Sequence, residues 1–168
     1  VGPAFPGTQF KIAEDGEILI KGDGVMSGYH NQPEQTAEVI DDDGWFHTGD
    51  QGALEDGVLR IAGRIKETIR SGGKSVVPDE VERALCSHAG VAEAAAVGLP
   101  DAEWGEIVAA AVVPAPGAVL TSQALLEHCQ RELSPHKRPK LIRLVDSLPR
   151  SHYGKVQRAK VKAALTGA

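Results

Sequence analysis

Aromatic residues are scarce in this chain, at 4% of its 168 residues, although 42% of the residues are apolar. A packed core must therefore rest on Val, Leu, Ile and Ala, and the length allows one domain of ordinary size or two small ones. Cysteine is also rare, and Cys86 and Cys129 lie far apart, each in a helix-like apolar pattern. Two such residues do not form a disulfide framework, so we predict two buried thiols in a reducing compartment.

Long apolar segments are missing as well. No apolar run approaches the 18 residues that a membrane-spanning helix requires. Residues 1–6 lack the basic segment and the following apolar segment of a signal peptide. Because the chain does not begin with Met, we expect it to start inside a longer sequence. We predict a cytoplasmic protein without a membrane span, and its oligomeric state stays open.

The charge is distributed unevenly. The formal net charge of -5 argues against a nucleic-acid surface as the main function. The last part of the chain is nevertheless basic, and only Glu132 and Asp146 oppose its cations between residues 131 and 162. The basic residues of this segment are Arg131, Lys137, Arg138, Lys140, Arg143, Arg150, Lys155, Arg158, Lys160 and Lys162. We predict that this basic tail meets an anion.

The pattern of strands and helices predicts an α+β fold, in which a small β-rich subdomain precedes a compact C-terminal domain with a small mixed sheet flanked by helices. Residues 1–62 contain short strands, such as 17–21 and 57–61, broken by turns and by one short helix over 33–40. Strands alternate with helices in the rest of the chain. We expect strands over 91–97, 107–113 and 141–145, and helices that begin at Pro78, after Thr121 and at Val156. We place the domain boundary at residues 63–66.

Several common catalytic motifs are absent. Neither Gly73-Lys74 nor Gly154-Lys155 has the upstream glycine of a phosphate-binding P-loop, because Thr68 and Pro149 occupy those positions. The six histidines and two cysteines show no metal-ligand spacing. No Gly-x-Ser-x-Gly elbow is present. These observations exclude a P-loop nucleotidase, and they do not support a metal site or a catalytic triad.

Three segments carry residues that suit a ligand, although each has an ordinary alternative. Asp50 follows the run GWFHTG and offers two acceptor oxygens to a pair of neighbouring hydroxyls, such as those of a ribose. Gly72 and Gly73 allow a backbone to approach a ligand closely. Lys155 lies in a basic, glycine-bearing loop that can place one mobile cation in a site. By themselves, these segments also fit two plain turns and a solvated basic surface.

The order and spacing of the motifs are more informative. Together they closely resemble the superfamily of acyl-CoA synthetases, adenylation domains and luciferases over essentially all 168 residues, and within it a fatty-acid or organic-acid CoA ligase. The motifs, in chain order, are GEI at 16–18, GY at 28–29, PEQT at 33–36, GWFHTGD at 44–50, GRIK at 63–66, SGG at 71–73, PDEVE at 78–82, GLPD at 98–101, GE at 105–106, PR at 149–150 and GKVQR at 154–158.

The resemblance implies a role for particular residues. Asp50 would bind the ribose hydroxyls of ATP, and Arg64 would help to bind the ribose and the phosphates. Lys66 would be the hinge about which a mobile C-terminal domain, residues 67–168, alternates between two states. Lys155 would promote adenylation between the acid and the α-phosphate. Gly72, Gly73 and Lys74 would lie along the CoA pantetheine channel, and the segment 136–140, with Lys137 and Arg138, would approach the CoA phosphates.

The resemblance also implies what is missing. The phosphate loop, the adenine pocket and the acyl tunnel of the superfamily would lie upstream of Val1, and Mg²⁺ would bind mainly there with ATP. We therefore expect an incomplete ligase that is inactive alone, and its acid cannot be read from this chain. One departure is Tyr153, where the superfamily usually has Ser or Thr. The alternatives are an adenylation domain that loads a carrier protein, a ligase that stops at the acyl-adenylate, and a non-catalytic CoA- or nucleotide-binding module.

Overall fold

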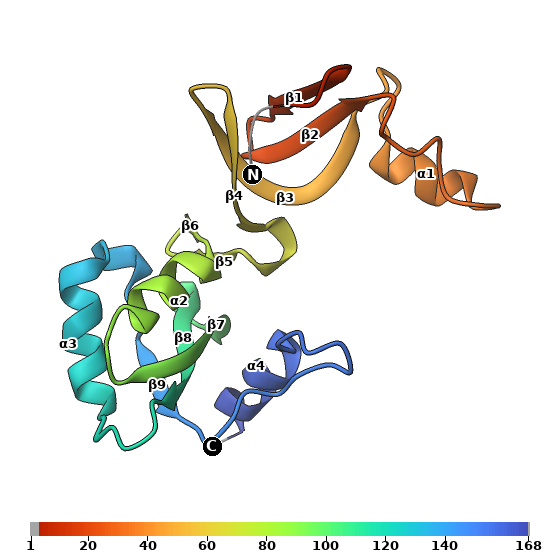
Figure 1. The fold of residues 1–168 in the computed structure, drawn as a ribbon. Coiled ribbons are helices and arrows are strands. Elements are labelled where there is room, and N and C mark those ends of the chain that lie inside the picture. Colours follow the sequence, from red (N-terminus) through yellow and green to blue (C-terminus); the bar gives the residue numbers. More distant parts are fainter. Residues whose placement is uncertain (1–3, 168) are drawn as a thin grey trace. The chain divides into compact units, whose positions relative to one another are not determined.

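The computed structural model describes residues 4–167. The chain divides into two compact units, Val1–Lys66 and Glu67–Ala168 (Figure 1). A short 3₁₀ turn, η1 (Ile65–Glu67), follows the last strand of the first unit. Each unit has its own sheet.

The first unit is a four-stranded antiparallel sheet with one short helix. Its strands are β1 (Thr8–Ile12), β2 (Glu17–Gly22), β3 (Phe46–Glu55) and β4 (Val58–Arg64), and they pair in sequence order. Helix α1 (Pro33–Val39) begins at the proline, as the sequence predicts. Within the described part of this unit, the buried apolar side chains are Ile18, Leu19 and Leu59. This core is small.

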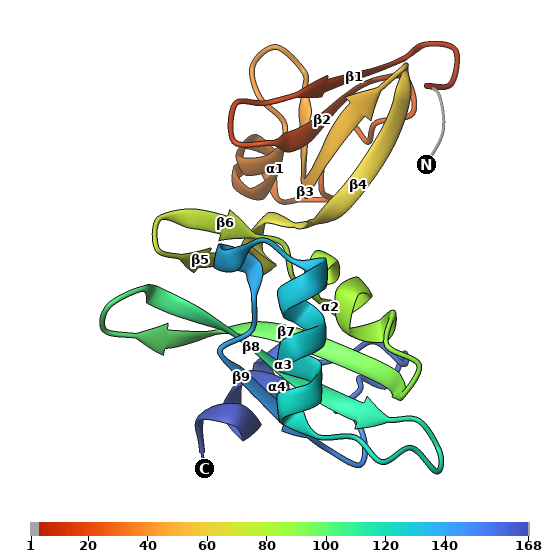
Figure 2. The same ribbon diagram turned by 90° about the vertical axis from the view of Figure 1, so that its left-hand side faces the viewer.

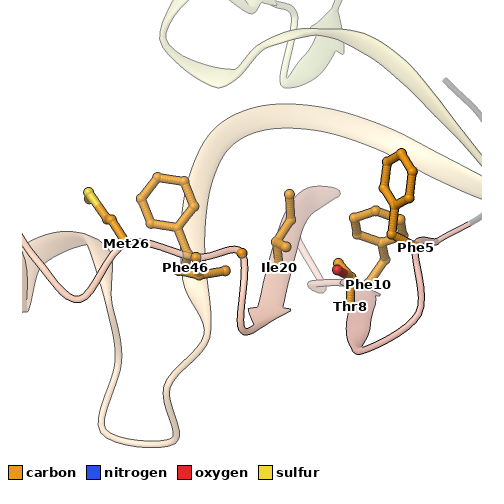
Figure 3. A pocket seen from close by; sticks show the side chains of 8 residues that line it. Phe5, Thr8, Phe10, Ile20, Met26 and Phe46 are labelled. Carbon is orange, nitrogen blue, oxygen red and sulfur yellow. The ribbon is translucent and has the colours of Figure 1, made fainter.

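Apolar side chains of the first unit also line a surface hollow of about 520 Å³ (Figure 3). They come from β1, β2, the start of β3 and the segments before β1 and after β2, and Figure 3 labels Phe5, Thr8, Phe10, Ile20, Met26 and Phe46. Phe5 is 82% exposed and Met26 is 36% exposed. One side of this unit therefore presents apolar surface to water.

The second unit contains a five-stranded mixed sheet. Its strands are β5 (Ile69–Ser71), β6 (Lys74–Val76), β7 (Val91–Asp101), β8 (Gly105–Pro114) and β9 (Leu141–Leu144). The order is β6-β5-β8-β7, and β9 pairs with β8 in parallel. Strand β8 is central, since it pairs with β7 on one side and with β5 and β9 on the other.

Helices cover both faces of this second sheet (Figure 2). Helices α2 (Pro78–Cys86) and α3 (Ser122–Glu132) pack on one face, in a cluster that includes Leu85, Leu125 and Val108. Helix α4 (Arg158–Thr166) packs on the other face with Ala109 and Val161. Because β7 and β8 are buried on both faces, their sequences read as continuous apolar runs rather than as an alternation.

The predicted α+β class and the mixed sheet flanked by helices are confirmed. Thr121 caps α3 by accepting a hydrogen bond from the Ala124 amide at 3.2 Å. The last helix begins at Arg158 instead of Val156, because Val156 pairs with Arg150 in a β-bridge. The prediction of two buried thiols is wrong for Cys86, which is exposed, and right for Cys129.

Candidate functional site

Lys155 lies in a short loop that folds back on itself before α4. Arg150 and Val156 form an isolated antiparallel bridge, and the Ser151 amide donates to the Lys155 carbonyl oxygen at 2.7 Å. Gly154 turns the chain with a φ of 80°, a left-handed value that glycine adopts without a steric penalty. The backbone around Lys155 is therefore held by hydrogen bonds within the loop.

The Arg150 side chain attaches this loop to the sheet. Its guanidinium donates to the Gly154 carbonyl oxygen and to Glu93 Oε2 on β7, each at 2.6 Å. The Lys155 side chain is exposed, and within residues 4–167 its ammonium has no hydrogen-bond or ion-pair partner. An unpaired cation on a fixed backbone can meet an anion that approaches from outside the loop.

Among the residues that the structure describes, the Tyr153 side chain makes no hydrogen bond to the loop around Lys155. Its ring is 88% exposed and contacts the His152 ring edge to face, with 5.5 Å between the ring centres. The hydrogen bonds that hold the loop come from Ser151, Gly154 and Arg150 instead.

Asp50 and Arg64 lie side by side on neighbouring strands of the first unit. They are register partners on β3 and β4, and Arg64 Nε donates to Asp50 Oδ1 at 2.8 Å. The Asp50 side chain is 24% exposed, so its carboxylate stays accessible beside the cation. The carboxylate of such a pair can accept hydrogen bonds from hydroxyl groups, and the guanidinium can donate hydrogen bonds to phosphate oxygens.

Glu17 holds the segment that leads into Asp50, through contacts that sequence reasoning missed. Its carboxylate accepts the Gly49 amide at 2.8 Å and pairs with His47 Nδ1 at 2.7 Å. Glu17 is only 9% exposed. More than 25 residues separate it from its partners, so no local pattern reveals the contact.

Lys66 lies at the end of the first unit. It is exposed and belongs to the turn η1, and the second unit begins at the next residue, Glu67. Gly63 and Arg64 are still part of β4, where they pair with Gln51 and Asp50. Ile65 and Lys66 are therefore the first residues after the sheet.

Gly72 and Gly73 form the two-residue turn between β5 and β6, and Lys74 is exposed beside them. Their φ values are 57° and 75°, both in the left-handed region, as the tight hairpin turn requires. The Gly72 amide donates to the Trp104 carbonyl oxygen at 2.9 Å. A Cβ on Gly72 would lie 2.8 Å from the Trp104 ring, so this position also needs glycine for space.

Lys137 and Arg138 have partners within the second unit. Lys137 Nζ donates to both carboxylate oxygens of Glu80, at 2.7 and 2.8 Å. Arg138 donates to the carbonyl oxygens of Leu133 and Gln130 near the end of α3, each at 2.9 Å. A bound phosphate would have to share these cations with their partners. Lys140 instead lies over the Trp104 ring, 5.4 Å from its centre.

The structure thus brings some of the predicted site residues together. Asp50 contacts Arg64, and Gly72, Gly73 and Lys74 share one hairpin, whereas Lys155 stands in a separate loop. Within residues 4–167 no group of three or more His, Cys, Asp and Glu side chains is arranged to hold a metal ion. None of the helices in this part of the chain is long and apolar enough to cross a membrane.

Comparison with known proteins identifies the class. Residues 80–155 match the family described as the AMP-binding enzyme C-terminal domain. The whole chain resembles an ATP-bound structure of MatB from Rhodopseudomonas palustris with a TM-score of 0.91 and 36% identity, over 98% of this chain and 35% of MatB. An apo structure of the same protein matches over the same shares with a TM-score of 0.75. The chain therefore matches the C-terminal part of acyl-adenylate-forming enzymes.

Within this class, curated relatives are acid–CoA ligases. The chain is 47% identical to a methyl-dioxo-octahydro-indenyl propanoyl:CoA ligase of Rhodococcus jostii, over 94% of this chain and 31% of the relative. It is 46% identical to a sulfoacetate–CoA ligase of Cupriavidus necator, over 87% of this chain and 29% of the relative. The chain therefore spans about a third of the length of the relatives that it matches.

Proposed function

We propose that this chain is the part of an ATP-dependent acid–CoA ligase that brings Lys155 to the reacting phosphate. In the first half-reaction, a carboxylate oxygen of the acid attacks the α-phosphorus of ATP, and pyrophosphate leaves. In the second, the CoA thiol loses its proton, the sulfur attacks the acyl carbon, and AMP leaves. The observation that carries the proposal is the exposed Lys155 ammonium, which has no partner within residues 4–167, on a loop held by hydrogen bonds.

The first half-reaction needs such a cation. The carboxylate and the α-phosphate are both anionic, so their approach is opposed by charge repulsion. An ammonium between them reduces this repulsion and stabilises the negative charge of the transition state. Arg150 holds the loop through Glu93 and Gly154, so Lys155 need not order its own backbone as it meets the substrate.

Asp50 and Arg64 fit the nucleotide. In the proposed complex the Asp50 carboxylate accepts hydrogen bonds from the two ribose hydroxyls, and Arg64 contributes positive charge to the ribose and phosphate side. Their existing contact orients both side chains before ATP arrives. The described residues offer no cluster of metal ligands, so we assign none of them to Mg²⁺.

The two half-reactions need different surfaces at the same place, because the thiol must enter where Lys155 stood. We propose residues 1–62 as the last β-subdomain of the adenylating region, 63–66 as the hinge, with Lys66 as the residue about which the domain turns, and 67–168 as the mobile domain. The exposed position of Lys66 next to the second unit supports this division.

In the second state, Gly72, Gly73 and Lys74 would face the pantetheine arm of CoA. The glycine turn presents backbone without side chains, which lets a narrow thiol arm pass close to it. Lys137 and Arg138 would approach the CoA phosphates while sharing their present partners, Glu80 and the end of α3. The relatives' names refer to different acids, so we propose only a carboxylic acid as substrate.

The test uses the full-length protein that carries this chain. Lys155→Ala is expected to lower acyl-adenylate formation by about 10² to 10³, the effect of removing one charge-stabilising group. The variant is expected to convert supplied acyl-adenylate and CoA to the thioester at the normal rate. Acid-dependent exchange between pyrophosphate and ATP measures the first step, and thioester release measures the second.

Lys160→Ala is the matched control, since Lys160 is also an exposed lysine, five residues further along the chain. It should leave both steps unchanged. Normal adenylate formation by Lys155→Ala would refute the proposal. If the acyl group is transferred to a carrier protein instead of CoA, the full-length protein is a carrier-loading adenylation enzyme and not a CoA ligase. The 168-residue chain alone should form no thioester from ATP, CoA and acids.

A further inference from the structure

Among residues 67–167, Arg158 has the side chain with the most hydrogen bonds, and the proposed reaction leaves it without a role. Its guanidinium has five N–H donors, and all five are used. Nε donates to Glu67 at 2.6 Å, and Nη2 donates to Asp79 at 2.9 Å and to Glu82 at 3.3 Å. Nη1 donates to Glu82 and to the Ala96 carbonyl oxygen. This fork geometry fixes the position of the guanidinium.

These partners come from separate segments that meet at Arg158. Asp79 and Glu82 lie on α2, and Ala96 lies on β7. Glu67 lies at the start of the second unit, directly after Lys66. Arg158 itself is the first residue of α4, three residues after Lys155. One side chain thus joins the segment at the domain boundary to the base of the Lys155 loop.

The cation is stable in this position. The Arg158 side chain is 22% exposed, which disfavours the charge, but the hydrogen bonds and charges of Glu82 and Glu67 outweigh burial and raise the pKa of the guanidinium. Partly buried ion pairs with several charge-assisted hydrogen bonds hold their geometry better than exposed pairs do. A lysine could not use the same fork of donors.

We propose that Arg158 is a positioning residue that couples the Lys155 loop to the hinge segment through Glu67. The inference rests on the proposed function. The Asp79, Glu82 and Ala96 contacts attach Arg158 to the body of the second unit, whereas the Glu67 contact attaches it to the boundary. Rotation at Lys66 therefore carries the Lys155 loop as a rigid extension of the hinge, and the loop does not flex independently. The position of the Lys155 ammonium relative to the substrate is therefore determined by the hinge angle alone.

The first test uses this chain and needs no substrate. Glu67→Gln keeps the shape of the side chain and removes its charge, and Glu67 is exposed, so the fold should survive. Amide hydrogen exchange reports the order of the loop at three amides, those of Ser151, Gly154 and Gln157. Each of them donates a hydrogen bond to a backbone carbonyl oxygen in or next to the loop. We expect these amides to exchange about tenfold faster in the variant, and amides of β8 to keep their protection. Glu127→Gln, an exposed position on α3, is the matched control and should change neither set.

The second test measures the reaction in the full-length protein. Glu67→Gln should lower kcat for adenylate formation about tenfold, leave the KM for ATP unchanged, and leave thioester formation from supplied adenylate unchanged. Asp79→Asn removes a different contact of the same guanidinium and spares the boundary. It should lower kcat less than Glu67→Gln does. A general loss of stability would not produce this difference between the two variants.

The outcomes separate the two proposals. If Glu67→Gln leaves both loop exchange and adenylation unchanged, the coupling through Glu67 is refuted while the role of Lys155 stands. Faster exchange throughout the second unit would mean a purely structural ion pair, and that also overturns the inference. If Lys155→Ala retains adenylation, the proposed function itself fails, whatever Glu67→Gln does.

Discussion

The two cysteines show how a helical pattern can mislead at the scale of one residue. Cys129 faces the core from α3 and is completely buried, and burial, with a smaller contribution from Glu132, raises the pKa of its thiol to about 11. Cys86 is the last residue of α2 and follows the buried Leu85, so it points about 100° away around the helix. Partial burial and then Glu82 raise the pKa of its thiol as well.

Thiol labelling is expected to distinguish these two residues. At pH 8 in the folded chain, an uncharged alkylating reagent should modify Cys86 alone, and more slowly than free cysteine, because a raised pKa leaves less thiolate. For Cys129 the folded pKa lies above the unfolded one. The thiol therefore stabilises the fold at pH values below about 9, and this contribution is lost as the pH rises from about 9 towards about 11. Cys129 should become reactive over that range.

Mass spectrometry of the alkylated chain counts the modified thiols at each pH. Cys86→Ser is the control, and it should abolish labelling at pH 8. Labelling of both thiols under native conditions would contradict the burial of Cys129, and labelling of neither would contradict the exposure of Cys86.

At the scale of the element, the turn of the β5–β6 hairpin requires glycine at two consecutive positions. Gly72→Ala and Gly73→Ala each place a side chain at a left-handed φ, which costs about 1 kcal/mol. Only Gly72→Ala also forces the Trp104 ring to move, so we expect it to lower the free energy of unfolding by a further 1 to 2 kcal/mol or so. Urea titrations of the three chains measure the difference.

Trp104→Ala in the Gly72→Ala background makes space for the new methyl group. A double-mutant cycle should therefore show that the two changes are less costly together than their sum. Gly57→Ala is the matched control, since Gly57 also has a φ of 75° and no atom within 4 Å of the added Cβ. Equal losses at positions 57, 72 and 73 would refute the close approach of Trp104.

Sequence patterns predicted the buried elements better than the polar ones. The apolar runs of β7 and β8 and the capped helix α3 were clear because burial on a long element leaves a long signal. Strands β5 and β6 have three residues each, which is too few to show a periodic pattern of apolar residues. Strand β1 lies at the edge of its sheet, and polar residues interrupt its apolar ones. Motif order points to Asp50, Arg64 and Lys155, whose roles stay predictions. It does not reveal the Glu17–His47 or Glu67–Arg158 contacts, because 30 and 91 residues separate the two partners.

At the scale of the whole molecule, the two units differ greatly in core size. Three buried apolar residues belong to the described part of the first unit, namely Ile18, Leu19 and Leu59, whereas the second unit buries two clusters on the faces of its sheet. Since burial of apolar surface is the main stabilising contribution to folding, the first unit should be the less stable of the two. Each unit contains one tryptophan, Trp45 or Trp104.

This distribution allows the stability of each unit to be measured separately. In Trp104→Phe the fluorescence reports the first unit, and in Trp45→Phe it reports the second. We expect the Trp45 signal to change at a lower urea concentration and with a smaller slope of free energy against urea, since less surface is exposed when the small sheet unfolds. Far-ultraviolet circular dichroism of both variants should follow two steps. Coincident transitions at both tryptophans would instead mean that the units unfold as one, and a boundary at Lys66 that acts as a hinge would then lose its physical basis.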